Sequence, residues 1–387
     1  MTWATAALGD VCNIVSGATP RTSERSFWGG SILWTTPKDL SDLDGAYLDR
    51  PPRTITEEGL KSCAASLLPR NSVLLSSRAP IGLVAINTVP MATNQGFKSL
   101  VPDRRKLDSK FLFHWLKSRT SFLQGLGNGA TFKEISKAVV ERIEIPLPPL
   151  DEQRQIAAIL DKADALRRKR ERALDLLDSL TQSIFVETFG QRRDSMLELK
   201  DVVKKGTIVT YGIVQAGPEY PGGVPYIRTG DLIDGSIKLD GLRRTDPMIA
   251  ARFSRSRVEA GDIVMSIRAT VGTTAVVLPE LDGANLTQGT ARIAPGPNVQ
   301  PNYLIEYLRS EKIQRWIAAQ VKGATFLEIT LGRLRELPVA VPPMHLQKKF
   351  SDTVERLRDT RAVCIEQATL TNSLFSSLQS RAFAGTL

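Results

Sequence analysis

Apolar residues recur at alternating steps of three and four positions along two long stretches of the chain. The stretches cover residues 156–184 and 350–378, with charged and polar residues at most other positions. This spacing places the apolar side chains on one face of an α-helix, and neither stretch contains proline or glycine. We therefore predict two helices of about 38 residues, each roughly 55–60 Å long.

A helix with a single apolar face needs a partner that covers this face. Each helix could pack on its own globular domain, or the two helices could pack against each other. Their length and regular spacing favour pairing, which we predict to be antiparallel, as in a coiled coil.

The rest of the chain shows mixed strand and helix patterns. β-branched runs flank a glycine-containing turn in "SVLLSSRAPIGLVAI" (72–86) and "DIVMSIRATVGTTAVVL" (262–278), which indicates strand, turn and strand. Amphipathic helices are predicted over residues 109–126 and 301–320. His114 lies in the first of these helices and is interpreted as a packing residue.

Several fragments occur twice at an offset that drifts only between 190 and 194 residues. Such a repeat indicates two copies of one domain with small insertions in loops. The fragments are "LGDV" at Leu8 and "LKDV" at Leu199, "TPKDL" at Thr36 and "RTGDL" at Arg228, "VLLSSRAPIG" at Val73 and "IVMSIRATVG" at Ile263, "TNQGFKSLVP" at Thr93 and "LTQGTARIAP" at Leu286, and "GATFKEI" at Gly129 and "GATFLEI" at Gly323.

The repeat and the helical patterns together predict an α+β fold. We expect two tandem, pseudo-symmetric mixed α/β domains at residues 1–145 and 191–338. We expect two long helices to separate the domains and to pair with each other, a central one at 146–190 and a C-terminal one at 339–387.

The positive charge is concentrated in the two globular segments. Lys and Arg outnumber Asp and Glu by 18 to 13 over residues 1–150 and by 20 to 16 over residues 191–338, whereas the counts are 7 to 8 over residues 151–190 and 6 to 4 over residues 339–387. Two separated basic units suit a polyanionic partner.

The sequence lacks the motifs of common catalytic sites. No GxxxxGK[ST] loop, GxSxG turn or HExxH helix occurs, and the three cysteines and two histidines form no metal-binding pattern. No run approaches the roughly 18 apolar residues that span a bilayer, and no signal peptide is evident. We expect a non-catalytic, cytoplasmic protein without a resident metal or cofactor.

Two copies of a domain that each end in "GATF(K/L)EI", a proline-rich exit and a long helix resemble the specificity subunit of Type I restriction-modification enzymes. The most specific stretch is "IPLPPLDEQRQIAAIL" at residues 145–160, supported by "SGATP" at Ser16 and "SSRAPIG" at Ser76. The second copy departs from this pattern, because "MHLQKKF" replaces "LDEQRQI" and retains only the glutamine, Gln347 for Gln153.

The resemblance implies a function in phage defence without catalysis by this chain. Each target-recognition domain would read one half of a bipartite, asymmetric sequence in double-stranded DNA. The helices would act as spacer and docking site for two modification subunits, which methylate adenine with S-adenosylmethionine. Restriction subunits would use ATP and Mg²⁺. An alternative from another class is a structural or adaptor protein whose basic domains bind protein or anionic partners.

Residues shared by both copies cannot explain different half-targets, so they belong to the frame or contact phosphates. Arg78 and Arg268 occupy equivalent turns and could contact phosphates or brace their own turns through carbonyl groups. Gln95 and Gln288 have the same two interpretations.

Base-reading side chains are expected where the copies diverge, because arginine, lysine, asparagine and glutamine pair with base edges. The candidates are Arg21, Arg25, Lys38, Arg228, Arg243, Arg244 and Arg255.

Two further interpretations concern the helices. The arginine-rich run at residues 167–172, with Arg170 on the apolar seam, is interpreted as a solvated or partner-facing helix surface, and a DNA contact is the alternative. Phe132 and Phe326 are predicted as buried anchors that dock each domain onto its helix.

Overall fold

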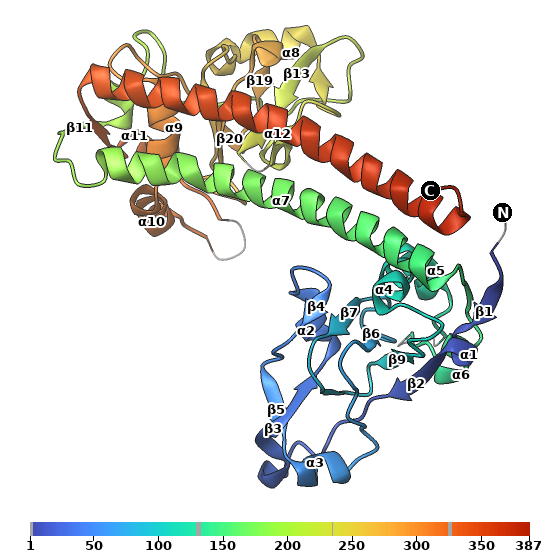
Figure 1. The fold of residues 1–387 in the computed structure, drawn as a ribbon. Helices are drawn as coiled ribbons and strands as arrows, with labels where there is room; N and C mark the ends of the chain where they lie inside the picture. The colour runs from blue at the N-terminus through green and yellow to red at the C-terminus, as the bar shows by residue number, and fades with distance from the viewer. Residues whose placement is uncertain (1–2, 129–132, 234, 324–326) are drawn as a thin grey trace. The chain divides into compact units, whose positions relative to one another are not determined.

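The computed structural model describes residues 3–128, 133–233, 235–323 and 327–387 (Figure 1). The chain divides into two compact units: residues 1–171 with 367–387, and residues 172–366. Each unit therefore contains one globular domain and parts of both long helices.

The first unit contains a five-stranded sheet with the order β2-β9-β6-β7-β4, in which only β4 and β7 are parallel. A smaller sheet has the order β5-β3-β8, and β1 pairs with β10. The strands are β1 (Thr5–Ala7), β2 (Cys12–Ser16), β3 (Trp28–Thr35), β4 (Tyr47–Leu48), β5 (Arg53–Ile55), β6 (Val73–Leu75), β7 (Val84–Asn87), β8 (Ala92–Thr93), β9 (Lys98–Pro102) and β10 (Glu144–Pro146).

Short helices connect these strands, and α4 covers the larger sheet. Phe111 and Leu116 of α4 are fully buried in the same cluster as Leu75 and Leu100 of the sheet. The helices are α1 (Leu8–Val11), η1 (Arg25–Phe27), α2 (Pro37–Ser41), α3 (Glu57–Lys61), α4 (Ser109–Ser118), α5 (Thr120–Gly125) and α6 (Lys137–Glu141).

The second unit repeats this arrangement with the sheets β12-β20-β17-β18, β16-β13-β19, β14-β15 and β11-β21. Its strands are β11 (Ser195–Glu198), β12 (Thr210–Tyr211), β13 (Val224–Ile227), β14 (Leu232–Ile233), β15 (Ser236–Ile237), β16 (Arg244–Thr245), β17 (Ile263–Ser266), β18 (Thr274–Val276), β19 (Asn285–Leu286), β20 (Thr290–Ile293) and β21 (Pro338–Val341). Its short helices are η2 (Leu199–Asp201), η3 (Thr229–Asp231), α8 (Pro247–Arg252), η4 (Ser254–Ser256), η5 (Pro279–Leu281), α9 (Pro301–Arg309), α10 (Glu311–Gln320) and α11 (Leu331–Arg335). The predicted α+β repeat is confirmed.

The stretch predicted as one helix before each GATF element is two helices. The first copy breaks after Ser118 and the second at Ser310. In both copies the serine hydroxyl donates a 2.6 Å hydrogen bond to the carbonyl three residues earlier, of Trp115 or Tyr307. A serine side chain that bonds the backbone in this way competes with continuation of the helix.

A glycine at the end of β2 and of β12 allows close contact between backbones. A Cβ atom at Gly17 would lie 2.0 Å from the carbonyl oxygen of Asn94, and one at Gly212 would lie 1.9 Å from that of Leu286. No larger residue fits at either position without movement of the backbone. The "SGATP" fragment is therefore a structural feature of the domain.

The two long helices are α7 (Leu150–Phe189) and α12 (Met344–Ala384). In the first unit, α7 and α12 meet where Arg170 donates to Gln367 and the Arg167 guanidinium lies over the Phe375 ring. In the second unit they meet where Arg361 bonds Asp178.

In the first unit the N-terminal half of α7 thus meets the C-terminal half of α12. In the second unit the C-terminal half of α7 meets the N-terminal half of α12. The prediction of antiparallel pairing is confirmed, and Arg170 lies on the seam as predicted.

Each long helix begins in the core of one unit and ends in the core of the other. Ile156 and Leu160 of α7 are buried in the first unit, whereas Phe185 and Phe189 are buried in the second. The helix α12 reverses this order, and its Phe383 packs against Phe111 of the first unit with ring centroids 5.5 Å apart.

A buried glutamine attaches the first turn of α7 to the first domain. The side chain of Gln153 is fully buried, donates to the carbonyl groups of Lys106 (2.9 Å) and Pro148 (2.8 Å), and accepts a hydrogen bond from the backbone N–H of Asp108 (2.8 Å). Loop and helix are therefore joined by one side chain.

Gln347 makes the same three bonds in the second copy. It donates to the carbonyl groups of Asn298 (3.1 Å) and Pro342 (2.8 Å) and accepts from the N–H of Gln300 (2.9 Å). This explains why the glutamine remains where "LDEQRQI" becomes "MHLQKKF".

His114 is a buried packing residue, as predicted. Its Nε2 lies 2.7 Å from Oδ1 of Asp161 on α7, and the other carboxylate oxygen of Asp161 accepts a 2.7 Å bond from Lys110. These bonds tie α4 to α7.

Replacing Gln153 or Gln347 with alanine should lower the free energy of unfolding by about 2–4 kcal/mol, because backbone groups would be left buried without a partner. Chemical denaturation measures this loss. The matched control is Gln155→Ala on the exposed side of α7, which should change stability by less than about 0.5 kcal/mol. Equal effects of Gln153→Ala and Gln155→Ala would contradict the role of the buried glutamine.

The Phe185→Ala variant should destabilise the second unit by about 3–5 kcal/mol, because the ring lies within 6.5 Å of four other aromatic rings. Hydrogen exchange should accelerate at the amides of β17 and β20 and remain slow at β6 and β9. The exposed neighbour provides the control variant Val186→Ala. Equal acceleration in both units would show that the ring does not act on one domain alone.

Candidate nucleic-acid interface

Four of the repeated fragments lie side by side in the first domain. Asn94 donates its backbone N–H to the carbonyl of Thr35 (3.0 Å), Ser77 donates to Gly96 (2.7 Å), and Ile135 donates to the carbonyl of Ser77 (3.0 Å). These bonds connect the turns after β3, β8 and β6 and the segment before α6. We call this set of turns the turn row.

The second domain has the same row at equivalent positions. Thr287 donates to Ile227 (3.2 Å), Ile267 donates to Gly289 (2.9 Å), and Ile329 donates to the carbonyl of Ile267 (3.0 Å). Because these bonds involve only backbone groups, the row forms in both domains although their side chains differ.

Arg78 and Arg268 lie at equivalent positions of the turn row and pair with carboxylates. Arg78 lies 3.7 Å from Glu134, and Arg268 lies 3.1 Å from Glu328. In the first domain Lys98 also bonds Glu134, at 2.9 Å. Each arginine thus connects its turn to the end of the GATF element. A phosphate contact remains a prediction for both arginines.

Gln95 and Gln288 lie on the adjacent turn. Gln95 is exposed and accepts a hydrogen bond from the Thr19 hydroxyl, whereas Gln288 is half-buried and donates its backbone N–H to Ile213 at 3.0 Å. The part of the GATF element that contains Phe132 and Phe326 lies outside the described residues, so their docking role remains a prediction.

The predicted base readers of the first domain are exposed, and Arg21 and Arg25 come from one loop whereas Lys38 comes from α2. Arg21 precedes η1, and its carbonyl accepts from the Trp28 indole at 3.2 Å. Arg25 begins η1, and Lys38 lies in α2 directly on the turn row. Only Lys38 therefore belongs to the row itself.

Arg228 lies in the turn row of the second domain. Its Nε and Nη2 atoms donate to Asp231 at 3.0 and 2.7 Å, and this hydrogen bonding raises the pKa of the arginine above its usual value. Arg243 and Arg244 are exposed at the β16 edge of the three-stranded sheet, where Arg244 donates to the carbonyl of Gly223 at 2.8 Å. Arg255 is exposed in η4.

The structure adds Arg53, which sequence reasoning missed. Arg53 lies opposite Trp34 in the pairing of β3 with β5. In the second domain Tyr226 is the counterpart of Trp34, and its backbone N–H bonds the carbonyl of Arg243. Arg53 and Arg243 therefore occupy equivalent places. The available signal was the position of Arg53 within residues 35–54, a segment in which the two copies diverge.

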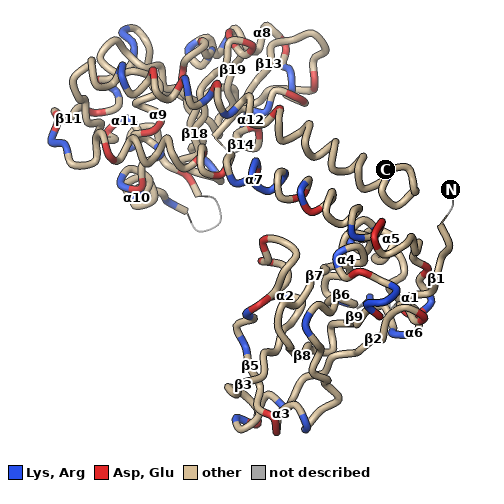
Figure 2. Tube along the Cα trace, viewed as in Figure 1, with Lys and Arg blue, Asp and Glu red and all other residues tan. Residues whose placement is uncertain are grey.

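The arginine-rich run of α7 is paired with acidic residues. Arg167 donates to Asp164 and Glu171, and Arg168 lies 3.0 Å from Asp164. Figure 2 shows the same mixing of basic and acidic residues along both units. Arg167 and Arg168, two of the five basic residues of the run, are thus ion-paired within their own helix, and the solvated or partner-facing surface remains a prediction.

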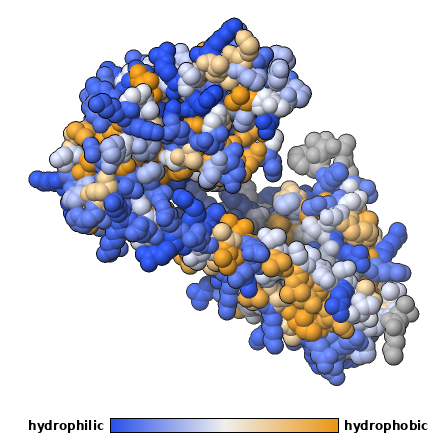
Figure 3. All heavy atoms as spheres, turned by 90° about the horizontal axis from the view of Figure 1, so that it is seen from above, coloured by the Kyte–Doolittle hydropathy of each residue, from blue (hydrophilic) through white to orange (hydrophobic). Residues whose placement is uncertain are grey.

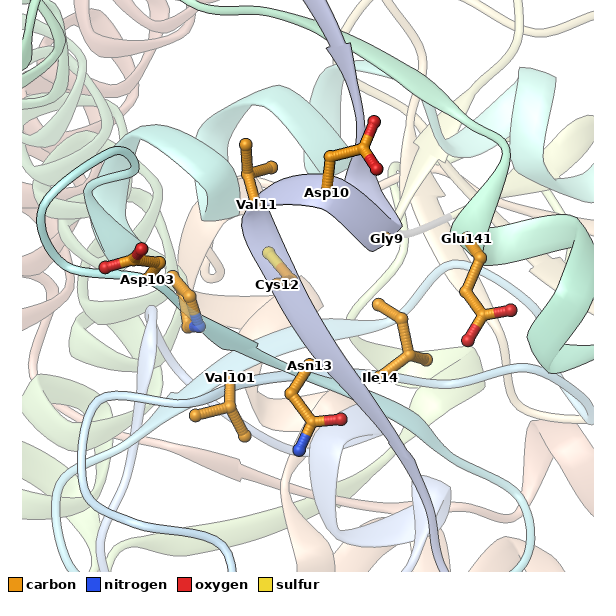
Figure 4. Close-up of a pocket in the computed structure, with 10 residues that line it drawn as sticks. Gly9, Asp10, Val11, Cys12, Asn13, Ile14, Val101, Asp103 and Glu141 are labelled. Atoms are coloured by element: carbon orange, nitrogen blue, oxygen red, sulfur yellow. The ribbon is translucent and has the colours of Figure 1, made fainter.

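A shallow hollow beside α1 and β2 carries the wrong charge for a nucleic acid (Figure 4). Asp10, Asp103 and Glu141 line it, and a phosphate there would meet three carboxylates. Burial raises the pKa of the neighbouring Cys12 thiol to about 12, so this cysteine stays protonated at neutral pH.

Other kinds of site find no support in the described part of the chain. No group of three or more His, Cys, Asp or Glu residues there could hold a metal ion. Among the same residues, no helix combines the length and the apolar character needed to cross a lipid bilayer.

The chain is similar to specificity subunits of Type I restriction enzymes. The model of the Type I restriction modification DNA specificity domain matches residues 1–175 and 195–372. The MjaIX specificity subunit of a Type I restriction enzyme from Methanocaldococcus jannaschii is 26% identical over 387 residues, covering 92% of this chain and 86% of that protein. The EcoR124I/EcoR124II specificity subunit from Escherichia coli is 32% identical over 166 residues, 41% of this chain and 40% of that protein.

Solved structures share the fold. A chain from a study of complex assembly and conformational transition of the type I R-M system has a TM-score of 0.61 and 19% identity, covering 100% of this chain and 98% of that chain. The S subunit of a Type I restriction-modification system from M. genitalium has a TM-score of 0.58 and 13% identity, covering 99% and 96%. Together with the two matches of the domain model, this shows that the chain belongs to the family of Type I restriction modification DNA specificity domains and carries two of them in tandem.

Proposed function

We propose that this chain is the DNA sequence-recognition subunit of a Type I restriction-modification complex, and that each domain reads one half of a bipartite, asymmetric target. The observation that carries the proposal is the turn row, which has the same backbone bonds in both domains but presents different side chains. Lys38 of the first row corresponds to Gly230 of the second, and Thr36 corresponds to Arg228. A shared frame with divergent polar groups suits two readers of different sequences.

The family match favours DNA over the protein or anionic partners of an adaptor. In this proposal the chain itself catalyses nothing. Modification subunits supply adenine methylation with S-adenosylmethionine, and restriction subunits supply ATP- and Mg²⁺-dependent steps.

Exposed apolar side chains on the long helices support docking of modification subunits there. Leu176 of α7 is 69% exposed and Leu370 of α12 is 63% exposed, and apolar surface is visible over the molecule in Figure 3. Apolar side chains that no other part of the described chain covers are typical of an interaction surface.

The two docking sites cannot be identical in charge. Asp151 and Glu152 lie in the first turn of α7, whereas His345 and Leu346 stand at the corresponding positions of α12. Since the buried glutamine that follows is the same in both, the difference affects the surface and leaves the attachment of the helix unchanged. We propose two modification subunits bound with unequal affinity.

Exchange of residues 1–142 for the equivalent domain of a relative should change one half of the methylated sequence, because each half is read by one turn row. Methylome sequencing of cells that carry the exchanged chain with its modification subunits measures this directly. A change in both halves, or in neither, would refute the division of labour. The matched control is exchange of residues 191–338, which should change the other half.

Binding of the assembled complex to duplex DNA should weaken on the order of 10³-fold or more between 50 and 200 mM salt, as expected when six or more phosphates are contacted. Fluorescence anisotropy with a labelled duplex measures the affinity. Binding that is unaffected by salt would favour the adaptor alternative. A labelled anionic polymer without bases serves as the control for charge alone, and we expect it to bind at least tenfold more weakly.

A further inference from the structure

In each turn row, one aspartate caps the first turn and also pairs with the side chain of an arginine. In the first domain Asp39 accepts the backbone N–H of Thr36 at 2.7 Å and lies 3.8 Å from Nη2 of Arg53. In the second domain Asp231 accepts the backbone N–H of Arg228 at 2.8 Å and binds the guanidinium of the same residue. The two aspartates occupy equivalent positions of the repeat.

Arg53 is held in one orientation while part of it stays accessible. Its guanidinium carbon lies 4.9 Å from the centre of a Trp34 ring, and its Nη2 donates to the Thr36 hydroxyl at 2.9 Å. Its side chain is nevertheless 47% exposed, whereas that of Asp39 is 10% exposed. Each Nη atom carries two N–H groups, so the second N–H of Nη2 and the adjacent N–H of Nη1 form a fork of donors, for which we find no acceptor among the described residues.

The two arginines reach their aspartates from different places in the chain. Arg53 comes from β5, opposite Trp34, whereas Arg228 directly precedes η3. The recurring feature is therefore a guanidinium oriented by the capping carboxylate, and not an arginine at one position of the repeat. A position needed only to stabilise the frame would be expected to keep its place, as Gln153 and Gln347 do.

The carboxylate beside each guanidinium decides between two kinds of DNA contact. Asp39 and Asp231 offset the positive charge of the guanidinium beside them and weaken its attraction for a phosphate, as Glu134 and Glu328 do for Arg78 and Arg268. The O6 and N7 atoms of guanine are neutral acceptors that require a planar, correctly oriented fork of donors. Asp39 and Asp231 thus favour contact with a base edge.

We infer that Arg53 and Arg228 each read a guanine through its O6 and N7 atoms, one in each half of the target, and that Asp39 and Asp231 are positioning residues that orient them. This inference rests on the proposed function and adds the base and the side chain that recognises it.

The first test uses the Arg53→Lys variant, which keeps the charge but loses the planar fork. In the assembled complex with its modification subunits, we expect one guanine position in the half read by residues 1–142 to lose its preference roughly ten- to hundredfold. All other positions should stay unchanged in the methylome. The matched control is Arg50→Lys, because Arg50 is an exposed arginine of the same loop and should leave every preferred base unchanged.

The second test leaves the protein intact and therefore does not depend on folding of a variant. Duplexes with 7-deazaguanine at single positions of the target lack the N7 acceptor. We expect methylation by the wild-type complex to fall about tenfold or more at one guanine in each half. Arg53→Met, which removes every donor of the side chain, should abolish this sensitivity in the first half only, and Arg228→Met in the second half only.

The outcomes separate this inference from the proposed function. A bipartite target in which either half contains no guanine on either strand would overturn the inference, as would sensitivity to 7-deazaguanine in the first half that Arg53→Met leaves intact. Either result would leave the proposed function standing. A complex that methylates no specific sequence would instead overturn the proposed function.

Discussion

Each long helix buries apolar side chains near both of its ends in two different cores, and the rest of the molecule depends on this arrangement. The first turns of α7 lie in the core of one unit, and its last turns, with Phe185 and Phe189, lie in the core of the other. The helix α12 makes the reverse connection. Since buried aromatic side chains contribute several kcal/mol each to stability, neither core is complete with the residues of its own copy alone.

In each domain, backbone groups hold the turn row together, and side chains are the groups proposed to recognise DNA. Backbone hydrogen bonds between Thr35, Asn94, Ser77 and Ile135 and between their counterparts build the turn row. Side chains that vary between the copies project from it without taking part in those bonds. A substitution that changes what a row recognises therefore need not weaken the row, which allows two different readers to be built on one design.

Sequence patterns predicted the long helices and the repeat because these are set by many residues at once. Periodicity over about ten helical turns is hard to mistake. The break after Ser118 was not predicted, because one serine hydroxyl decides it against an amphipathic pattern that continues on both sides. Gln153 and Gln347 stood out as the residues that both copies retain, but their role requires knowledge of which backbone groups lie around them.

The candidate interface was less predictable. Sequence divergence pointed to the correct segment for Arg53 but not to the residue. The pairing of β3 with β5 is short, prolines precede β5 and glycines lie within β3, so the sequence does not reveal which residues of the two strands lie opposite each other. The salt bridges of Arg78 and Arg268 with the end of the GATF element were equally hidden, since they join segments about 60 residues apart.

The positions of the helix ends also determine the order in which the cores of the two units can be completed during synthesis. Residues 367–387 belong to the first unit, together with residues 1–171. During translation residues 3–171 of the first unit emerge before the second unit, yet Ala382 and Phe383, which pack into the core of the first unit, emerge after it. The second unit, residues 172–366, is available in full before then. The domain that is made first is therefore the one whose folding finishes last.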